Sequence, residues 1–273
     1  MIEVTGVSKA FGRQAVLHEV DWRVRPGEFW GLIGPNGSGK TTLLNLISGV
    51  EKPDAGRISL HGRQLASYAR KALSRKVAVL QQDGLPPVAY GVREVVEMGR
   101  FPYQDWRGKE KDGALGSRRL IDEIMERLDL KGLEQRPLNV LSGGQRQRAA
   151  LGKVMAQQPE LVLLDEPTTY LDLRYQMQFM ELIADWRREE GLTVVSVMHD
   201  LNLAALFCDR LLVMGEGRIV AQGPPEEILS PDMIRTVFGV HAHRVAHPDM
   251  GVPQLLLRRE QAQSSGQDRR RNG

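Results

Sequence analysis

One short glycine-rich segment restricts the possible folds more than any other part of the chain. Residues 34–41 read GPNGSGKT and match the pattern G-x-x-x-x-G-K-[ST]. They follow the apolar residues 29–33, which predict a buried strand, and they lead into residues 41–47, which predict a helix. Glycines let backbone N–H groups curl around an anion, and the helix that follows aims its unpaired N–H groups at the same place. The segment therefore predicts a phosphate-binding loop between a strand and a helix.

The residues of this loop have separate expected roles. Lys40 supplies a mobile cation for the terminal phosphates, and the Thr41 hydroxyl can bind Mg²⁺. A nucleotide and Mg²⁺ are therefore the expected ligands. The residues of this segment expected to bind the nucleotide are Gly34, Pro35, Asn36, Gly37, Ser38, Gly39, Lys40, Thr41 and Thr42.

Composition favours a soluble α/β protein with a sizeable core, since 41% of the 273 residues are hydrophobic and 5% are aromatic. No stretch approaches 18 consecutive apolar residues, and the chain does not open with a basic and then apolar leader, so we expect neither a membrane span nor export. The single cysteine, Cys208, excludes an internal disulfide, and its apolar surroundings predict a small buried side chain. Part of the net charge of +3 lies in the C-terminal residues 259–273, which we expect to be a disordered tail; no nucleic-acid partner is expected.

The order of the predicted elements favours a P-loop NTPase (RecA-like) core with two additions. Residues 1–24 predict antiparallel β structure, and residues 83–140 contain helical patterns but no convincing strand. Elsewhere buried strands alternate with helices, which predicts a mostly parallel sheet. We therefore expect an ATPase-type core from residues 1–82 and 141–258, with an N-terminal antiparallel β subdomain, and an inserted helical subdomain from residues 83–140.

Chemically suitable residues follow directly on four predicted buried strands, and the carboxyl ends of parallel strands form the ligand-binding edge of such a sheet. Besides the phosphate-binding loop, these are Gln82, Asp165 with Glu166, and His199. Asp165 is expected to hold Mg²⁺, and Glu166 beside it is the expected base for an attacking water. The Gln82 amide can bond both a metal-bound water and the nucleophile, while His199 can bond the γ-phosphate. A surface carboxylate and a core histidine are the plainer alternatives for Glu166 and His199.

A second anion-binding helix start is expected at Leu141-Ser142-Gly143-Gly144-Gln145. Ser142 is a good N-cap, and the two glycines after it expose the backbone. One nucleotide rarely needs two such loops from one chain. We therefore expect a second copy of the chain to supply this loop across a dimer interface.

With these motifs in this order, residues 2–240 resemble an ABC-transporter ATPase subunit. The resemblance implies ATP hydrolysis by two copies that enclose two ATP molecules head to tail. It implies that the residues acting across the dimer are Ser142, Gly143, Gly144, Gln145 and Asp172. It also implies that Phe11 stacks on adenine, although packing at a strand end is an alternative for that side chain.

Residues 92–102, 165–172 and 199–205 are similar to importers of iron-siderophore complexes, haem and vitamin B12. That resemblance implies an integral membrane permease as partner, indirectly a solute-binding protein, and a place on the cytoplasmic face of the membrane. The residues expected to couple to the permease are Arg93, Met98, Arg100 and Phe101. Simple packing within the helical subdomain is the alternative for each. A manganese or zinc importer, an exporter, and a soluble ABC-type ATPase stay open as other functions.

Overall fold

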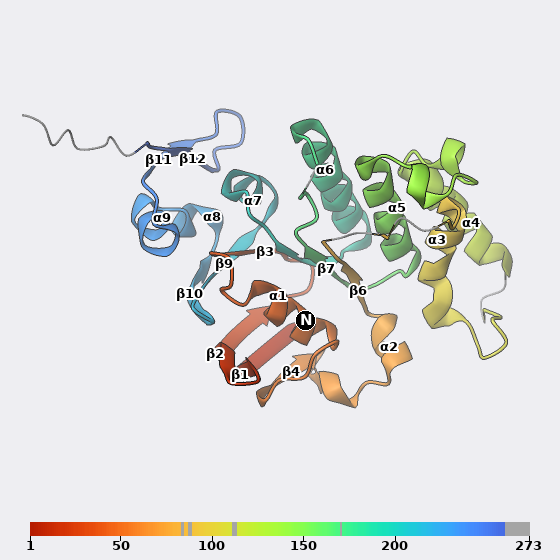
Figure 1. Cartoon of the computed structure of the whole chain (residues 1–273), viewed down its shortest axis with the longest axis horizontal. Coiled ribbons are helices and arrows are strands. Elements are labelled where there is room, and N and C mark those ends of the chain that lie inside the picture. The colour runs from red at the N-terminus through yellow and green to blue at the C-terminus, as the bar shows by residue number, and fades with distance from the viewer. Residues whose placement is uncertain (83–84, 87–88, 111–113, 170, 260–273) are drawn as a thin grey trace, which may run out of the picture.

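A six-stranded, mostly parallel sheet runs through the centre of the molecule (Figure 1). The computed structural model describes residues 1–82, 85–86, 89–110, 114–169 and 171–259. The strands of this sheet, in spatial order, are β10 (Arg218–Gly223), β9 (Arg210–Gly215), β3 (Phe29–Ile33), β8 (Thr193–Val197), β7 (Leu161–Asp165) and β6 (Val77–Leu80). Only the edge strand β10 is antiparallel to its neighbour. The predicted α/β fold is confirmed.

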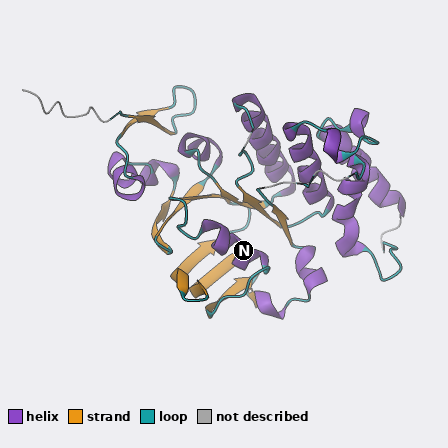
Figure 2. Ribbon diagram, in the orientation of Figure 1, coloured by secondary structure: helices purple, strands orange, loops and turns teal. Residues whose placement is uncertain are grey.

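The pleat of this sheet divides the apolar residues between two cores, because successive side chains of a strand point to opposite faces. In β3, Trp30 and Leu32 face helix α1 (Lys40–Ser48), whereas Phe29 and Ile33 face the other way. The helices of that second face are α5 (Gly143–Ala156), α6 (Leu173–Glu190) and α7 (Leu201–Phe207). Figure 2 shows the resulting layers, with α1 on one side of the sheet and these three helices on the other.

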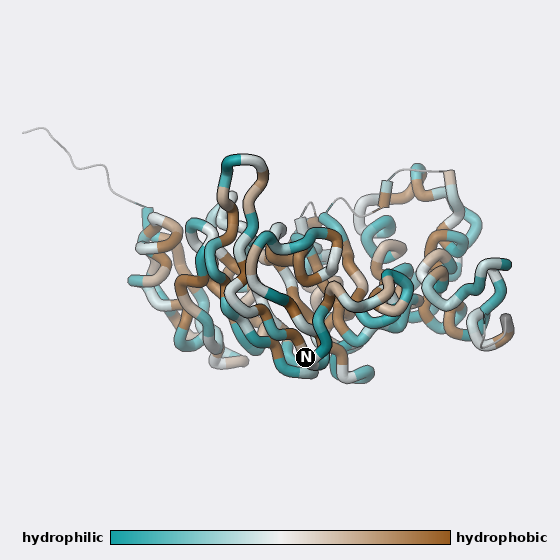
Figure 3. Tube along the Cα trace, turned by 90° about the horizontal axis from the view of Figure 1, so that it is seen from below, coloured by the Kyte–Doolittle hydropathy of each residue, from teal (hydrophilic) through white to brown (hydrophobic). Residues whose placement is uncertain are grey.

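A second, antiparallel sheet covers α1 from outside. Its strands, in spatial order, are β2 (Gln14–Val24), β1 (Ile2–Phe11), β4 (Ala55–Leu60) and β5 (Arg63–Gln64). The Trp22 ring of β2 meets the Trp30 ring edge-on, with 5.3 Å between ring centroids, so the two sheets share one core with α1. Figure 3 shows apolar positions gathered in the middle of the molecule, with many polar positions along its outline.

A group of helices lies at one end of the molecule, beyond β6 (Figure 1). It contains α3 (Val92–Glu97), the 3₁₀ helix η2 (Met98–Tyr103) and α4 (Ala114–Arg127), all close to α5. The short elements η3 (Lys131–Leu133) and η4 (Leu138–Val140) follow α4 in the chain, whereas η1 (Leu65–Ser67) packs beside β4 and α2 (Arg70–Ser74) lies next to β6. The described residues of the segment 85–140 form no named strand, as the sequence predicts. In the described part of the chain, every helix is too short or too polar to cross a membrane.

The C-terminal part contains α8 (Pro225–Ile228), α9 (Pro231–Phe238) and a hairpin of β11 (Ala242–Ala246) and β12 (Pro253–Leu257). Neither α9 nor the hairpin is predicted from the sequence. Asn202 of α7 attaches the hairpin to the core, because its Oδ1 accepts from the Leu255 N–H at 2.7 Å. Cys208 directly follows α7 and is buried with its sulfur 3.6 Å from that of Met198, which confirms the expected small buried side chain. The predicted disordered tail, apart from Arg259, falls outside the described residues.

Candidate functional site

The phosphate-binding loop connects the end of β3 to the start of α1, as predicted. At two of its positions only glycine fits, for a different reason at each. Gly39, just before α1, has a φ of 98°, which L-residues with a Cβ rarely adopt. A Cβ on Gly34 would lie 2.2 Å from the Met214 carbonyl oxygen of the neighbouring strand. The sequence therefore forms an open backbone cradle where a larger residue would not fit.

Lys40 fills the centre of this cradle. Its side chain is buried, and its ammonium donates to the carbonyl oxygens of Gly34 and Pro35, each at 2.8 Å. Burial lowers the pKa of Lys40, while the nearby carboxylates of Glu166 and Asp165 act in the opposite direction. The two carbonyl dipoles compensate this buried positive charge only in part. A phosphate would supply the full anionic partner that it lacks.

Ser38 supplies a second polar group in the cradle. Its side chain is 3% exposed, and its hydroxyl has no hydrogen-bond partner among the described residues. An unsatisfied buried hydroxyl costs free energy unless a ligand or water pairs with it. The loop therefore has both a cation and a free hydroxyl available for an anion.

The donor set for Mg²⁺ forms where α1 begins beside the end of β7. The Thr41 hydroxyl donates to Oδ1 of Asp165 at 3.2 Å. Burial raises the pKa of Asp165, and the bond from Thr41 opposes that rise. Mg²⁺ prefers oxygen ligands and usually takes only one or two from the protein, the others coming from water and phosphate. This hydroxyl and carboxylate fit such an ion.

Glu166 lies between two groups from neighbouring strand ends. Gln82, after β6, donates from Nε2 to one Glu166 carboxylate oxygen at 2.6 Å. His199, after β8, places Nε2 2.5 Å from the other oxygen. The Glu166 side chain is only 15% exposed, so both of its oxygens are held in a partly enclosed place. The structure thus brings together the three strand-end residues that the sequence singles out.

The backbone of Glu166 is unusual, with a φ of 49°. A non-glycine residue in this region costs about 1–3 kcal/mol and persists only where its surroundings fix it. The turn after it does so, because Thr169 donates from its N–H to the Glu166 carbonyl at 3.2 Å and from its hydroxyl to the carboxylate at 3.3 Å. The sequence alone gives no signal for this conformation.

The second predicted anion-binding segment begins α5. Ser142 caps this helix through a reciprocal pair of bonds with Gln145, at 3.3 Å and 3.0 Å. The N-cap prediction for Ser142 is confirmed, and Asp172 caps α6 by accepting from the Tyr175 N–H at 3.0 Å. The helix α5 lies on the opposite face of the central sheet from α1 (Figure 1). Within one chain, the start of α1 and the start of α5 therefore belong to helices on opposite faces of the central sheet.

Phe11 lies at the turn between β1 and β2 and is 49% exposed. The Lys9 ammonium lies 5.3 Å from the centre of its ring. An exposed aromatic ring of this kind can accept a flat base on its free face. The adenine contact of Phe11 stays a prediction.

The four predicted coupling residues differ sharply in exposure. Phe101 is 58% exposed, whereas Met98 is partly buried. Arg93 forms ion pairs with Glu134, at 2.9 Å, and with Asp122. Both carboxylates belong to the helical group itself, so Arg93 also holds that group together.

The expectation that Arg100 contacts a permease needs correction. The residue is 5% exposed, and its guanidinium donates to the Ala156 carbonyl at 2.9 Å and to the Gln158 side chain at 2.7 Å. It also pairs with the buried carboxylate of Glu110 at 3.3 Å. A cation that is already desolvated and paired in this way has an internal structural role and is not available at the surface.

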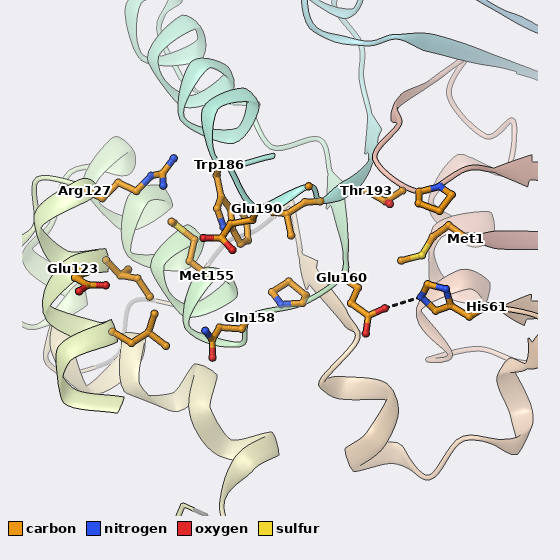
Figure 4. Close-up of a pocket in the computed structure, with 16 residues that line it drawn as sticks. Met1, His61, Glu123, Arg127, Met155, Gln158, Glu160, Trp186, Glu190 and Thr193 are labelled. Atoms are coloured by element: carbon orange, nitrogen blue, oxygen red, sulfur yellow. Dashed lines mark hydrogen bonds and ion pairs between the residues drawn. The ribbon is translucent and has the colours of Figure 1, made fainter. Parts of the chain in front are cut away.

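A hollow of about 360 Å³ lies at the opposite edge of the sheet, where β7 and β8 begin. Figure 4 shows Trp186 and Met155 on one side of it and the bonded pair of Glu160 and His61 on the other. It is therefore distinct from the place where Thr41, Asp165 and Glu166 converge. The groups suited to bind phosphate, Lys40 and Thr41, lie at the carboxyl edge and not in this hollow.

The known proteins that resemble this chain are ATP-binding proteins of ABC transporters. A family model described as "ABC transporter" matches residues 17–169. The ferric enterobactin transport ATP-binding protein FepC of Escherichia coli is 35% identical over 250 residues, which is 90% of each chain. The hemin import ATP-binding protein HmuV of Rhodococcus jostii is 38% identical over 260 residues, covering 95% of this chain and 87% of that protein.

Some relatives are longer than this chain. It spans 58% of the uncharacterized ABC transporter ATP-binding protein YvrA of Bacillus subtilis, with 37% identity over 261 residues. Among solved structures, the dimeric ATP-binding cassette MJ0796, in a post-hydrolysis state bound to ADP and Pi, superposes with a TM-score of 0.71 and 29% identity. That match covers 82% of this chain and 98% of the other.

Proposed function

The chain belongs to the ABC transporter family of ATP-binding proteins, and on that premise we propose that it powers the uptake of an iron chelate, haem or cobalamin through a separate membrane permease. The proposal of ATP hydrolysis depends on the Glu166 carboxylate. Gln82 and His199 hold this carboxylate at the edge of the sheet where the phosphate-binding loop lies. The similarity to FepC and HmuV along most of the chain supports the substrate class.

In the proposed reaction, the loop of residues 34–41 and Lys40 bind the phosphates of ATP. Glu166 accepts the proton of the attacking water, and Gln82 orients that water and the carboxylate together. His199 bonds the γ-phosphate from the other side. Mg²⁺, held by Thr41 and Asp165, would neutralise charge on the phosphates when bound.

The proposed partners are a second copy of the chain, at the start of α5, and the permease, at Phe101. A second copy would bring its Ser142–Gln145 segment and Asp172 to the γ-phosphate, since α5 and α1 lie on opposite faces of one chain. The exposed Phe101 and the neighbouring Met98 would contact the permease at the cytoplasmic face of the membrane. A solute-binding protein would act through the permease without touching this chain.

Uptake by cells that lack this chain tests the proposal. We expect the loss of uptake of at least one radiolabelled ferric siderophore, haem or cobalamin, restored by the parent chain but not by Lys40→Ala. The Lys40 variant is the control because it lacks the buried cation of the phosphate cradle. Normal uptake of all three chelates, with a defect in manganese or zinc uptake or in export, would assign the chain to another ABC system.

Phe101→Ala should separate coupling from hydrolysis, because this ring is exposed and contributes little to the core. We expect normal basal ATP hydrolysis and thermal stability of the isolated chain, but a severalfold loss of stimulation in proteoliposomes that contain the permease and a loaded binding protein. The matched control is Arg100→Met at the adjacent position, which should lower the melting temperature because its buried partners lose their cation. Equal stimulation of the Phe101 variant and the parent would remove Phe101 from the permease contact.

A further inference from the structure

The turn that follows Glu166 is held by a side chain of α5. Gln147, on the second turn of that helix, is partly buried and donates from Nε2 to the Pro167 carbonyl oxygen at 2.9 Å. A second glutamine, Gln176 of α6, donates to the carbonyls of Leu171 at 3.0 Å and Thr168 at 3.4 Å in the same connection. The described carbonyls of Pro167, Thr168 and Leu171 are thus held from two different helices.

The Gln147 bond acts next to the reactive group. Pro167 directly follows Glu166, which has a φ of 49°, so the carbonyl that Gln147 holds belongs to the same turn as the reactive residue. The bonds from Thr169 hold the same turn from within. A shift of the Pro167 carbonyl would therefore move the Glu166 carboxylate relative to Gln82 and His199.

Gln147 also connects this turn to the start of α5. Gln147 lies five residues after Ser142 in one continuous helix, which the reciprocal bonds between Ser142 and Gln145 begin. The ring of Tyr175 also packs beside Gly144, since a Cβ there would lie 3.4 Å from Tyr175 Cδ1. A displacement of residues 142–144 would therefore be passed along a rigid helix to Gln147.

We propose that Gln147 is a positioning residue that links each subunit's own base to the loop with which that subunit completes its partner's ATP site. This inference rests on the proposed assembly of two copies. In that assembly Glu166 acts on ATP bound by its own chain, whereas Ser142–Gln145 contacts the γ-phosphate bound by the other chain. ATP at one site thereby sets the orientation of Glu166 at the other, and hydrolysis is cooperative.

The test compares the dependence of hydrolysis on ATP concentration in the full chain and in Gln147→Met. Methionine keeps the length of the side chain but has no N–H to donate. With two sites, the Hill coefficient is expected to lie above 1 for the parent and to fall to about 1 for this variant. Gln147→Lys, which keeps a donor at the end of a long side chain, should retain the parental cooperativity.

Gln176→Met is the matched control. It removes the two glutamine bonds to the same connection that come from α6 and not from α5, so the Hill coefficient should stay parental. Melting temperatures of all variants separate misfolding from loss of coupling. Parental cooperativity in Gln147→Met, or equal loss in Gln147→Met and Gln147→Lys, would overturn the inference, as would a Hill coefficient of 1 in the parent.

A separate measurement distinguishes this inference from the function on which it rests. The association of two copies in ATP is followed by size-exclusion chromatography of the parent chain. A parent that never pairs contradicts the two-copy assembly and the inference together. A parent that pairs, combined with a Gln147→Met variant that keeps its cooperativity, contradicts the role of Gln147 alone.

Discussion

Glu166→Gln is expected to lower ATP turnover by about 10²–10⁴-fold, the usual contribution of a general base, while ATP binding is kept. The amide has nearly the shape of the carboxylate and still offers one oxygen to the Gln82 N–H. It cannot take a proton from water, so the bound ATP persists. Phosphate release under steady-state conditions and retention of labelled ATP on the purified chain measure the two effects separately.

The control for this variant is Glu160→Gln, which makes the same change just before the opposite end of β7. Glu160 pairs with His61 at 2.6 Å and has no contact with the phosphate cradle among the described residues. Its turnover should stay near that of the parent. If Glu166→Gln hydrolysed ATP at nearly the parental rate, another group would have to be the base.

The clustering of the site residues could be predicted because it depends only on the sheet. Gln82, Glu166 and His199 each follow a short apolar run, and parallel strands bring such positions to one edge. The cap of α5 could be predicted as well, because Ser142 is a residue type that caps helices. The cap that Asp172 gives α6 is not predicted from the sequence.

The burial of Arg100 could not be predicted from its neighbours. Arg100 and its neighbour Phe101 are both predicted to couple to the permease, yet the partners of Arg100 include Ala156 and Gln158, more than 50 residues further along the chain. Only the packing of η2 against the end of α5 shows that this cation is internal. A local pattern carries no information on a contact made at that separation.

The same limit applies to the link through Gln147 and to the C-terminal hairpin. The acceptor of Gln147 is a backbone carbonyl, which has no sequence signature, and the positive φ of Glu166 beside it is set by the turn. In β11 most side chains are exposed, so the strand lacks the apolar alternation that would predict it. Its hairpin is instead held by the polar side chain of Asn202.

Mixing two inactive variants is expected to restore nucleotide trapping, if each ATP site is built from two chains. Lys40→Ala removes the buried cation of the phosphate cradle, and Ser142→Arg blocks the start of α5 with a bulky side chain. In a mixed pair both lesions fall in the same site, which leaves the other site intact. Trapping should return to about one quarter of the parental level, because random pairing makes about half of the pairs mixed, each with one intact site of two.

The matched control places Lys40→Ala and Ser142→Arg in the same chain and mixes it with Lys40→Ala alone. Every site in that mixture lacks the lysine, so trapping should stay absent. Loss of the N-cap costs a helix about 1 kcal/mol, and the Ser142 variant must therefore be shown to melt near the parental temperature. A complementing mixture as inert as this control would contradict composite sites, because the start of α5 would then have no part in binding the nucleotide of a second chain.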